Sequence, residues 1–393
     1  MNNCLALLFA RDQNPALSPL TDTRITAAMP YAGKYRVVDF TLTNCLHSGI
    51  RNILVFTHQK YYSLQKHLRD GWSIFNPELG EYVTVVPPQL VVSPEQVKSD
   101  YDLLQQQIYL LERNSAQYVL ILNGSHIYRM DYAAMLQSHI DSDADMTLAC
   151  TDSYLTAQHS YFVSINDNDQ ISGLSTNASR HTFVSMGILI CNRFLLIEKL
   201  KKLATDLSKF PSLADAMVAA LAGEVNILAY PFGGTAGRVT QDHYWATIDS
   251  LDTYYQANMD LLNSRPAIDI YQPDWQIRTY QPQTPPARTI PGELGTEGIF
   301  INSICAGGTV IEGGSVQHSI LFSNVYVGDD AFVEQSIVFE QVKVGTGARI
   351  KSCIIEKGTI IPEDEEIGHN LRHDRERFLV TEKGLVVVPA DYY

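Results

Sequence analysis

The first two thirds of the chain alternates short apolar runs with segments whose apolar residues recur every three or four positions. The runs have the length of buried β-strands, and the periodic segments have the spacing of amphipathic helices. Strands alternating with helices predict an α/β domain with a mostly parallel, doubly wound sheet over residues 1–264. The expected strands are CLALLFA (4–10), NILVFTH (52–58), TVVPP (84–88), QYVLILNG (117–124) and DMTLACTD (145–152), with a hairpin over 161–174. The expected helices are DFTLTNCLHSGI (39–50), YYSLQKHLRDGW (61–72) and DYDLLQQQIYLLERN (100–114).

The last third has a different pattern. Residues 265–293 contain six prolines and are typical of an extended linker. After them, QHSILF (317–322), EQSIVF (334–339) and KSCIIE (351–356) follow one another at an interval of 17 residues. Short strands at a fixed period, separated by glycine turns, predict a β-helix whose coils stack their Val and Ile side chains. We therefore expect a left-handed parallel β-helix over residues 294–393, with a further strand near its end.

Composition and charge narrow the classes of partner. The formal net charge of −14 over 393 residues argues against a nucleic-acid partner, because phosphate backbones require a basic face. A local basic pocket is still compatible with a small anion. The six cysteines contain no C-x-x-C pair and predict reduced thiols rather than a metal site. No run has the length of a membrane span or the features of a signal peptide, so we expect a cytoplasmic protein without a membrane partner.

Six stretches together resemble bacterial glucose-1-phosphate adenylyltransferase, also called ADP-glucose pyrophosphorylase. The resemblance covers nearly the whole chain, and it implies a Rossmann-like nucleotidyltransferase domain followed by the β-helix. It also implies that ATP and glucose 1-phosphate react, with magnesium, to give ADP-glucose and pyrophosphate, in a tetramer controlled by sugar phosphates or related metabolites. The six stretches are AGKYRVVDFTLTNCLHSGIRNILVFTH, HLRDGW, GSHIYRMDY, SMGI, YWATIDSLDTYYQANMDLL and GGSVQHSILFSNVYVG.

The chain departs from this family where the nucleotide is expected to bind. The family's glycine-rich loop, which wraps the triphosphate, falls on a segment that contains Asp12, Gln13 and Asn14. Pro15 in the same segment has no N–H to donate. The family's phosphate-binding lysine is replaced by Thr26. We therefore do not expect this loop to cradle phosphates.

The two aspartates that bind the metal in the family are also replaced. Ser125 occupies one position, in Gly-Ser-His-Ile-Tyr, and Thr247 occupies the other. A neutral hydroxyl is a poor ligand for a hard cation, so no metal site and no catalytic residue are expected. The alternative acids, if the metal ligands have moved, are Asp249 and Asp12. In a strand, the Asp249 side chain would point to the same face as the Thr247 side chain.

The segment expected to bind the sugar phosphate has changed as well. The family's lysine for glucose 1-phosphate lies before its Ser-Met-Gly motif, and no such lysine precedes Ser185. Arg180 or His181 are possible substitutes, although a solvent-facing loop is the simpler interpretation of that segment.

These losses favour a catalytically degenerate regulatory subunit, of the kind found in some Gram-positive bacteria. Such a subunit would assemble with a catalytic paralogue, as a hetero-oligomer and by family analogy a tetramer, and would activate it in glycogen synthesis. Mg²⁺ and ATP would then be bound by the catalytic partner, and this chain would bind no cofactor. The alternatives are an active adenylyltransferase with relocated metal ligands and a free-standing sugar-phosphate sensor.

A basic group that the family uses near its effector site is retained. Lys34, Arg36 and Arg51 are candidates for an anion pocket, because arginine forks suit phosphate geometry. The structural alternative is that Arg36 and Arg51 pair with Asp39 or with backbone carbonyls. Basic residues on neighbouring elements that would join either arrangement are His58, His67 and Arg69.

Overall fold

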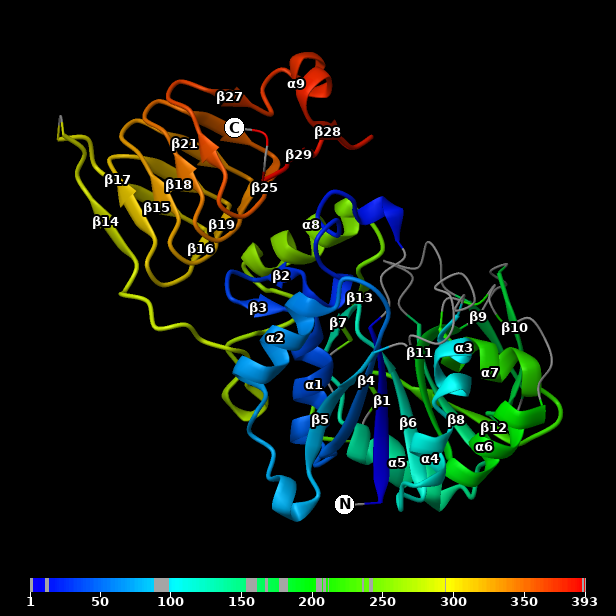
Figure 1. The fold of residues 1–393 in the computed structure, drawn as a ribbon. Helices are drawn as coiled ribbons and strands as arrows, with labels where there is room; N and C mark the ends of the chain where they lie inside the picture. Colours follow the sequence, from blue (N-terminus) through cyan, green and yellow to red (C-terminus); the bar gives the residue numbers. More distant parts are fainter. Residues whose placement is uncertain are drawn as a thin grey trace.

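The chain forms an α/β domain and a β-helix, joined by the proline-rich segment that runs along one side of both (Figure 1). None of the described helices is long and apolar enough to cross a membrane. The computed structural model describes residues 3–10, 14–87, 99–152, 161–166, 169–176, 183–202, 207, 210, 212–234, 237–239, 243–293, 295–390 and 392.

The elements of the α/β domain follow the hydrophobic pattern. The predicted helix over 100–114 is divided in two at Gln107, where the backbone leaves helical geometry with φ −119° and ψ 23°; the Gln107 side chain donates to the Pro87 carbonyl at 2.9 Å. The helices are α1 (Val37–His47), α2 (Tyr62–Gly71), α3 (Asp100–Gln106), α4 (Tyr109–Glu112), α5 (Tyr132–Asp141), α6 (Arg193–Lys202), α7 (Leu213–Leu221) and α8 (Leu251–Met259). The strands are β1 (Cys4–Ala10), β2 (Pro30–Tyr31), β3 (Tyr35–Arg36), β4 (Asn52–Thr57), β5 (Tyr82–Val86), β6 (Tyr118–Asn123), β7 (His126–Tyr128), β8 (Met146–Thr151), β9 (Phe162–Ile165), β10 (Ile171–Ser175), β11 (Phe183–Asn192), β12 (Ile227–Pro231) and β13 (Trp245–Thr247).

The main sheet has β1 at its centre. β1 runs parallel to β4 on one side and β6 on the other, and all of its residues are buried, as expected for a parallel sheet that helices cover on both faces. The strand order is β10-β9-β11-β6-β1-β4-β5; off this path, β8 pairs with β11, and β12 pairs with β8. β11 runs antiparallel to β6, so the parallel part of the sheet extends from β6 to β5. The predicted Rossmann-like domain is confirmed.

The β-helix consists of three parallel sheets, which is consistent with the predicted left-handed form. Ile320, Ile337 and Ile354 lie in register on neighbouring coils, which confirms the repeat of 17 residues. β14 falls within the proline-rich segment and pairs with β17, so the first coil begins there. The strands are β14 (Arg288–Ile290), β15 (Ile299–Ile301), β16 (Ile304–Cys305), β17 (Val310–Glu312), β18 (Ser315–Gln317), β19 (Ile320–Leu321), β20 (Tyr326–Val327), β21 (Phe332–Glu334), β22 (Ile337–Val338), β23 (Lys343–Val344), β24 (Arg349–Lys351), β25 (Cys353–Ile355), β26 (Ile360–Ile361), β27 (Glu366–Ile367), β28 (Leu379–Val380) and β29 (Val386–Val388), and α9 (Leu371–Arg377) precedes β28.

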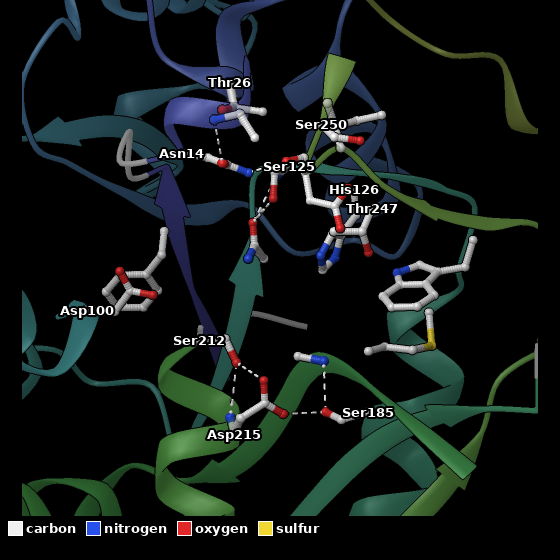
Figure 2. A pocket seen from close by; sticks show the side chains of 18 residues that line it. Asn14, Thr26, Asp100, Ser125, His126, Ser185, Ser212, Asp215, Thr247 and Ser250 are labelled. Carbon is white, nitrogen blue, oxygen red and sulfur yellow. Dashed lines mark hydrogen bonds between the residues drawn. The ribbon is translucent and has the colours of Figure 1, made fainter. Parts of the chain in front are cut away.

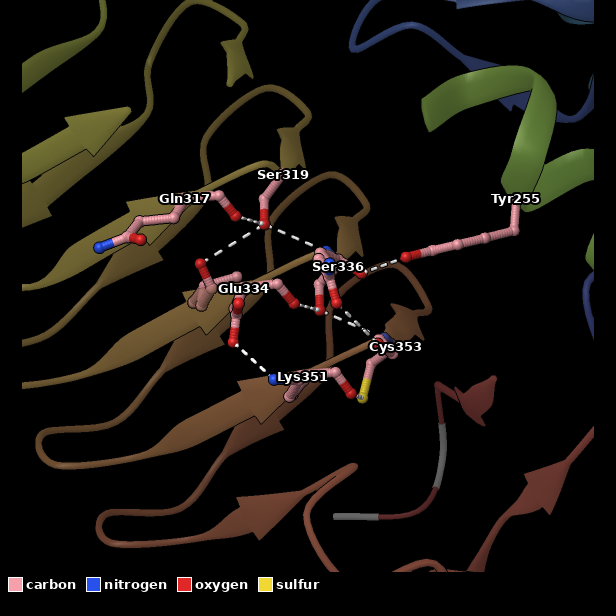
Figure 3. A network of polar contacts seen from close by, with 10 residues as sticks. Tyr255, Gln317, Ser319, Glu334, Ser336, Lys351 and Cys353 are labelled. Carbon is pink, nitrogen blue, oxygen red and sulfur yellow. Dashed lines mark hydrogen bonds and ion pairs between the residues drawn. The ribbon is translucent and has the colours of Figure 1, made fainter. Parts of the chain in front are cut away.

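A ladder of small polar side chains joins the coils at one corner (Figure 3). The Ser336 hydroxyl donates to the Glu334 carbonyl at 2.7 Å and accepts the Cys353 N–H at 3.1 Å. Ser319 does the same one coil earlier and accepts the Ser336 N–H at 3.0 Å. The backbone at this corner therefore has its hydrogen bonds satisfied although it is buried.

The α/β domain and the β-helix share one apolar core. Phe40 of α1 and Tyr254 of α8 belong to the same buried cluster as Phe322 and Phe339 of the β-helix. The Tyr254 and Phe339 rings meet edge to face with centroids 6.4 Å apart. This packing fixes the β-helix against the N-terminal ends of α1 and α8.

Replacing Ser336 with alanine is expected to destabilise the β-helix by about 1–3 kcal/mol, because the Cys353 N–H then loses its buried acceptor. Thermal unfolding followed by circular dichroism should show a lower midpoint for S336A. The control is S352A, which removes a partly exposed hydroxyl from the neighbouring corner position. An equal midpoint for S336A and wild type would show that the ladder contributes nothing to stability.

Candidate functional site

A cavity of about 420 Å³ lies beyond the carboxyl ends of β1 and β6, where open α/β sheets bind ligands. We call it the main cavity. The ribbon formed by β7 and β13 contributes to its wall, together with the turn that leads into α8 (Figure 2). Its polar lining includes Asn14, Thr26, Ser125, Ser185, Thr247 and Asp249.

The structure brings Ser125 and Thr247 together. Thr247 pairs with His126 across the ribbon, and the Ile248 N–H donates to the Ser125 carbonyl at 2.9 Å. The Ser125 hydroxyl donates to Asn123 Oδ1 at 2.6 Å. The Thr247 hydroxyl oxygen is buried and has no hydrogen-bond partner among the described residues. The two positions therefore form a single site, as the sequence implied, but the groups they present there are neutral.

The charged groups of the main cavity do not form a preassembled metal site. Among the described residues, no cluster of three His, Cys, Asp or Glu side chains has the geometry to hold a metal ion. Asp249 lines the cavity two residues after Thr247, and its Oδ1 accepts the Thr253 hydroxyl at 2.9 Å. Mg²⁺ often takes only one or two carboxylates and completes its coordination with substrate phosphates and water. Asp249 thus fits an ion that arrives with a phosphorylated substrate. Asp12, the other alternative acid, lies outside the described residues.

One end of the main cavity is built around a buried carboxylate. Asp215 accepts the Ser185 hydroxyl at 2.5 Å and the Ser212 hydroxyl at 2.6 Å, and the Gly187 N–H donates to Ser185 Oγ at 3.1 Å. Burial raises the pKa of Asp215 despite these two hydrogen bonds. Both hydroxyl protons are used on the carboxylate, and each serine oxygen already accepts one backbone N–H, from Gly187 or from Asp215, so one lone pair on each oxygen is left to accept from a ligand. This end therefore suits hydroxyl groups better than phosphate.

His126 lies on the wall of the main cavity as a neutral side chain. Burial lowers the pKa of His126 to about 3, so the imidazole carries no charge near neutral pH. Its ring packs edge to face with Trp245, with centroids 5.2 Å apart. No lysine or arginine is among the described residues that line the cavity. The described walls consequently recognise a ligand through hydrogen bonds and shape rather than through positive charge.

The segment that replaces the glycine-rich loop closes the opposite end of the main cavity. The Asn14 side chain accepts the Ala16 N–H at 3.0 Å, and its amide nitrogen donates to the Asp249 carbonyl. Thr26 lies beside it in a short 3₁₀ helix and is buried. Asn14 is therefore used to tie the loop to the turn before α8. Asp12, Gln13, Arg180 and His181 all lie outside the described residues.

A second cavity, of about 350 Å³, lies between the α/β domain and the β-helix. We call it the interface cavity. Lys34, Lys66 and Lys357 line it, and no ion pair joins any of these three to a described carboxylate. Burial lowers the pKa of Lys34. Arg36 and His67 complete the basic lining, which contrasts with the acidic character of the chain.

The predicted trio of Lys34, Arg36 and Arg51 is only partly brought together. Arg51 does not line the interface cavity; its guanidinium lies over the Phe75 ring, 5.9 Å from the centroid. Arg36 also has a structural role, because its guanidinium donates to the Ala28 carbonyl at 3.2 Å. Of the neighbouring candidates His67 lines the cavity, whereas His58 and Arg69 do not. Sequence patterns gave no signal for Lys66 and Lys357, because they come from an exposed helix face and a distant β-helix turn.

Comparisons with known proteins agree with this architecture. Residues 15–264 match the family model described as nucleotidyl transferase, and residues 285–388 match the model described as GlmU-like, C-terminal hexapeptide. The chain is 46% identical over 402 residues to glucose-1-phosphate adenylyltransferase 2 of Vibrio cholerae, covering 100% of this chain and 99% of that protein. It is also 35% identical over 398 residues to glucose-1-phosphate adenylyltransferase of Shewanella sp. (strain ANA-3), covering 98% and 94% of the two chains.

These relatives contradict the expectation of a catalytically degenerate regulatory subunit. They are named as enzymes and match this chain along its whole length, and they come from Vibrio and Shewanella rather than from Gram-positive bacteria. The expectation was wrong because it gave the combined loss of the family's motif residues more weight than the similarity of the whole chain. The expected catalytic partner rested on the same interpretation and loses its support. The chain belongs to the glucose-1-phosphate adenylyltransferase family.

Proposed function

We propose that the chain is an active glucose-1-phosphate adenylyltransferase, which converts ATP and glucose 1-phosphate to ADP-glucose and pyrophosphate. The observation that carries the proposal is the full-length similarity to relatives of that name. The position of the main cavity at the carboxyl ends of the parallel strands supports it. In this reaction a phosphate oxygen of the sugar phosphate attacks the α-phosphorus of ATP, and pyrophosphate leaves.

The lining of the main cavity supports one orientation of the substrates. The acceptor groups around Asp215 suit the glucose hydroxyls, and the phosphates then point toward Ser125 and Thr247. The chain's task is to align the reacting oxygen with the phosphorus, since phosphoryl-type transfers depend mainly on positioning and charge stabilisation. Mg²⁺ bound with the nucleotide would neutralise charge on the phosphates, and Asp249 is the residue that would hold it.

The first test is turnover by the isolated chain. Incubated alone with ATP, Mg²⁺ and glucose 1-phosphate, the purified protein is expected to release pyrophosphate and to form ADP-glucose in equal amounts. A coupled pyrophosphate assay and chromatography of the nucleotide sugar measure both products. Absence of both products from a folded chain would contradict the proposed activity.

The second test concerns the relocated carboxylate. D249N is expected to lower kcat/KM by a factor on the order of 10²–10³, the usual cost of losing one group that stabilises transition-state charge. D274N is the matched control, because Asp274 is exposed and lies outside the described lining of the main cavity. Equal kinetics for D249N and D274N would exclude a role for Asp249.

The interface cavity supports a regulatory role, which we propose as part of the same function. Three lysines without ion-pair partners among the described residues, together with Arg36, favour a small phosphorylated metabolite as the ligand. Residues of both domains line the cavity, so a ligand bound there would affect how the α/β domain packs against the β-helix.

K66Q is expected to weaken binding of inorganic phosphate about tenfold, because it removes one charge-assisted contact. Isothermal titration calorimetry measures the change. K343Q is the control, since Lys343 is an exposed residue of β23 that does not line the interface cavity. If K66Q and K343Q bind phosphate as wild type does, the interface cavity is not the anion site.

A further inference from the structure

We propose that Glu340 is an internal competitor for the anion in the interface cavity, which must displace this carboxylate from Arg36 in order to bind. The inference rests on the proposed anion site and adds to it a specific coupling between ligand binding and domain packing. Glu340 follows β22 in the β-helix and faces the α/β domain, where it lines the interface cavity with Arg36.

The contact between Arg36 and Glu340 uses only one of the two carboxylate oxygens. Arg36 Nη2 lies 3.1 Å from Glu340 Oε1, and the two side chains are 22% and 19% exposed. Glu340 Oε2 is buried and has no hydrogen-bond partner among the described residues. A bidentate arginine–carboxylate pair would satisfy both oxygens, and this pair satisfies one. Glu340 is therefore easier to displace from Arg36 than a carboxylate in a bidentate pair would be.

A neighbouring ion pair between the two domains is shorter and less exposed than the Arg36–Glu340 pair. Arg24 Nη2 lies 2.7 Å from Glu356 Oε1, and these side chains are only 12% and 10% exposed. The same Glu356 oxygen also accepts the Lys357 N–H at 2.8 Å. Both glutamates belong to β-helix turns that face the α/β domain. The Arg24–Glu356 pair thus holds the domains together, while the Arg36–Glu340 pair is the one open to exchange.

The charges around Glu340 favour such an exchange. Lys34, Lys66 and Lys357 lie around the same cavity without ion-pair partners among the described residues, so Glu340 neutralises only part of the positive charge. A phosphate group placed among these lysines would approach Arg36 and would repel the Glu340 carboxylate. It would also supply an acceptor oxygen for Arg36 Nη2, the nitrogen that contacts Glu340, while Nη1 keeps its hydrogen bond to the Ala28 carbonyl. Arg36 would then exchange a partner in the β-helix for the ligand.

The exchange has a reciprocal consequence. If the Arg36–Glu340 contact opposes anion binding, then anion binding must weaken that contact by the same free energy. Arg36 immediately precedes α1, whose first turn holds the buried Asp39 through the Arg36 backbone N–H at 2.8 Å. The ligand would therefore act where the α/β domain meets the β-helix and not at the main cavity itself.

The test compares E340Q with wild type and with E334Q. The E340Q side chain keeps its size but loses the charge that competes with the ligand, so inorganic phosphate is expected to bind it about tenfold more tightly by calorimetry. E334Q removes a β-helix glutamate that pairs with Lys351 away from the cavity, and it should bind phosphate as wild type does. When Arg36 is also replaced by glutamine, E340Q should raise the affinity for phosphate much less, because the guanidinium for which Glu340 and phosphate compete is then absent.

Two outcomes would overturn the inference, and they differ from failure of the anion site. Equal affinity of wild type and E340Q, with K66Q still weakening phosphate binding, would show that the anion site exists and that Glu340 does not compete for it. The same gain for E340Q and E334Q would show a general effect of net charge. If phosphate binds none of the variants, both the anion site and the competitor role are wrong.

Discussion

The packing of α1 and α8 against the β-helix is the contact on which both cavities depend. Phe40 and Tyr254 bring these helices into one apolar cluster with the β-helix residues Phe322 and Phe339. The main cavity reaches the turn immediately before α8, and the interface cavity reaches the β-turn immediately before α1. Because a close-packed core resists small displacements, the positions of both helix starts are set by how well the β-helix fits against them. The β-helix is thus part of the framework of the functional sites.

The two cavities differ in the charge of the side chains that line them. The described walls of the main cavity present hydroxyls, a neutral imidazole and the carboxylates of Asp100, Asp215 and Asp249, of which Asp215 is held by two serine hydroxyls. The interface cavity gathers positive charge from three separate elements of an acidic chain. Recognition in the first therefore rests on hydrogen-bond direction, and recognition in the second rests on Coulomb attraction that salt would weaken.

Buried carboxylates organise the surroundings of both cavities. Asp215 fixes the Ser185–Gly187 segment of β11, and Asp39 accepts hydrogen bonds from His67, Trp72 and the Arg36 backbone. Each has its oxygens satisfied, so each contributes precise orientation without an unpaired charge. Glu340 is the exception at the interface, with one oxygen left without a hydrogen bond among the described residues. A carboxylate in that state is the natural candidate for exchange with a ligand.

The sequence by itself determined the elements that repeat or alternate. The buried strands 4–10 and 118–123 and the β-helix period of 17 residues follow from local hydrophobic spacing, which a single chain displays directly. It also indicated that Ser125 and Thr247 belong to one site, through resemblance to a family.

What only the tertiary structure decided is which distant groups meet. Lys34, Lys66 and Lys357 converge although some 290 residues separate the last two, and Arg51 turns away to Phe75. The direction of a surface side chain carries no periodic signal, because it depends on how two domains pack and not on the local pattern of the chain.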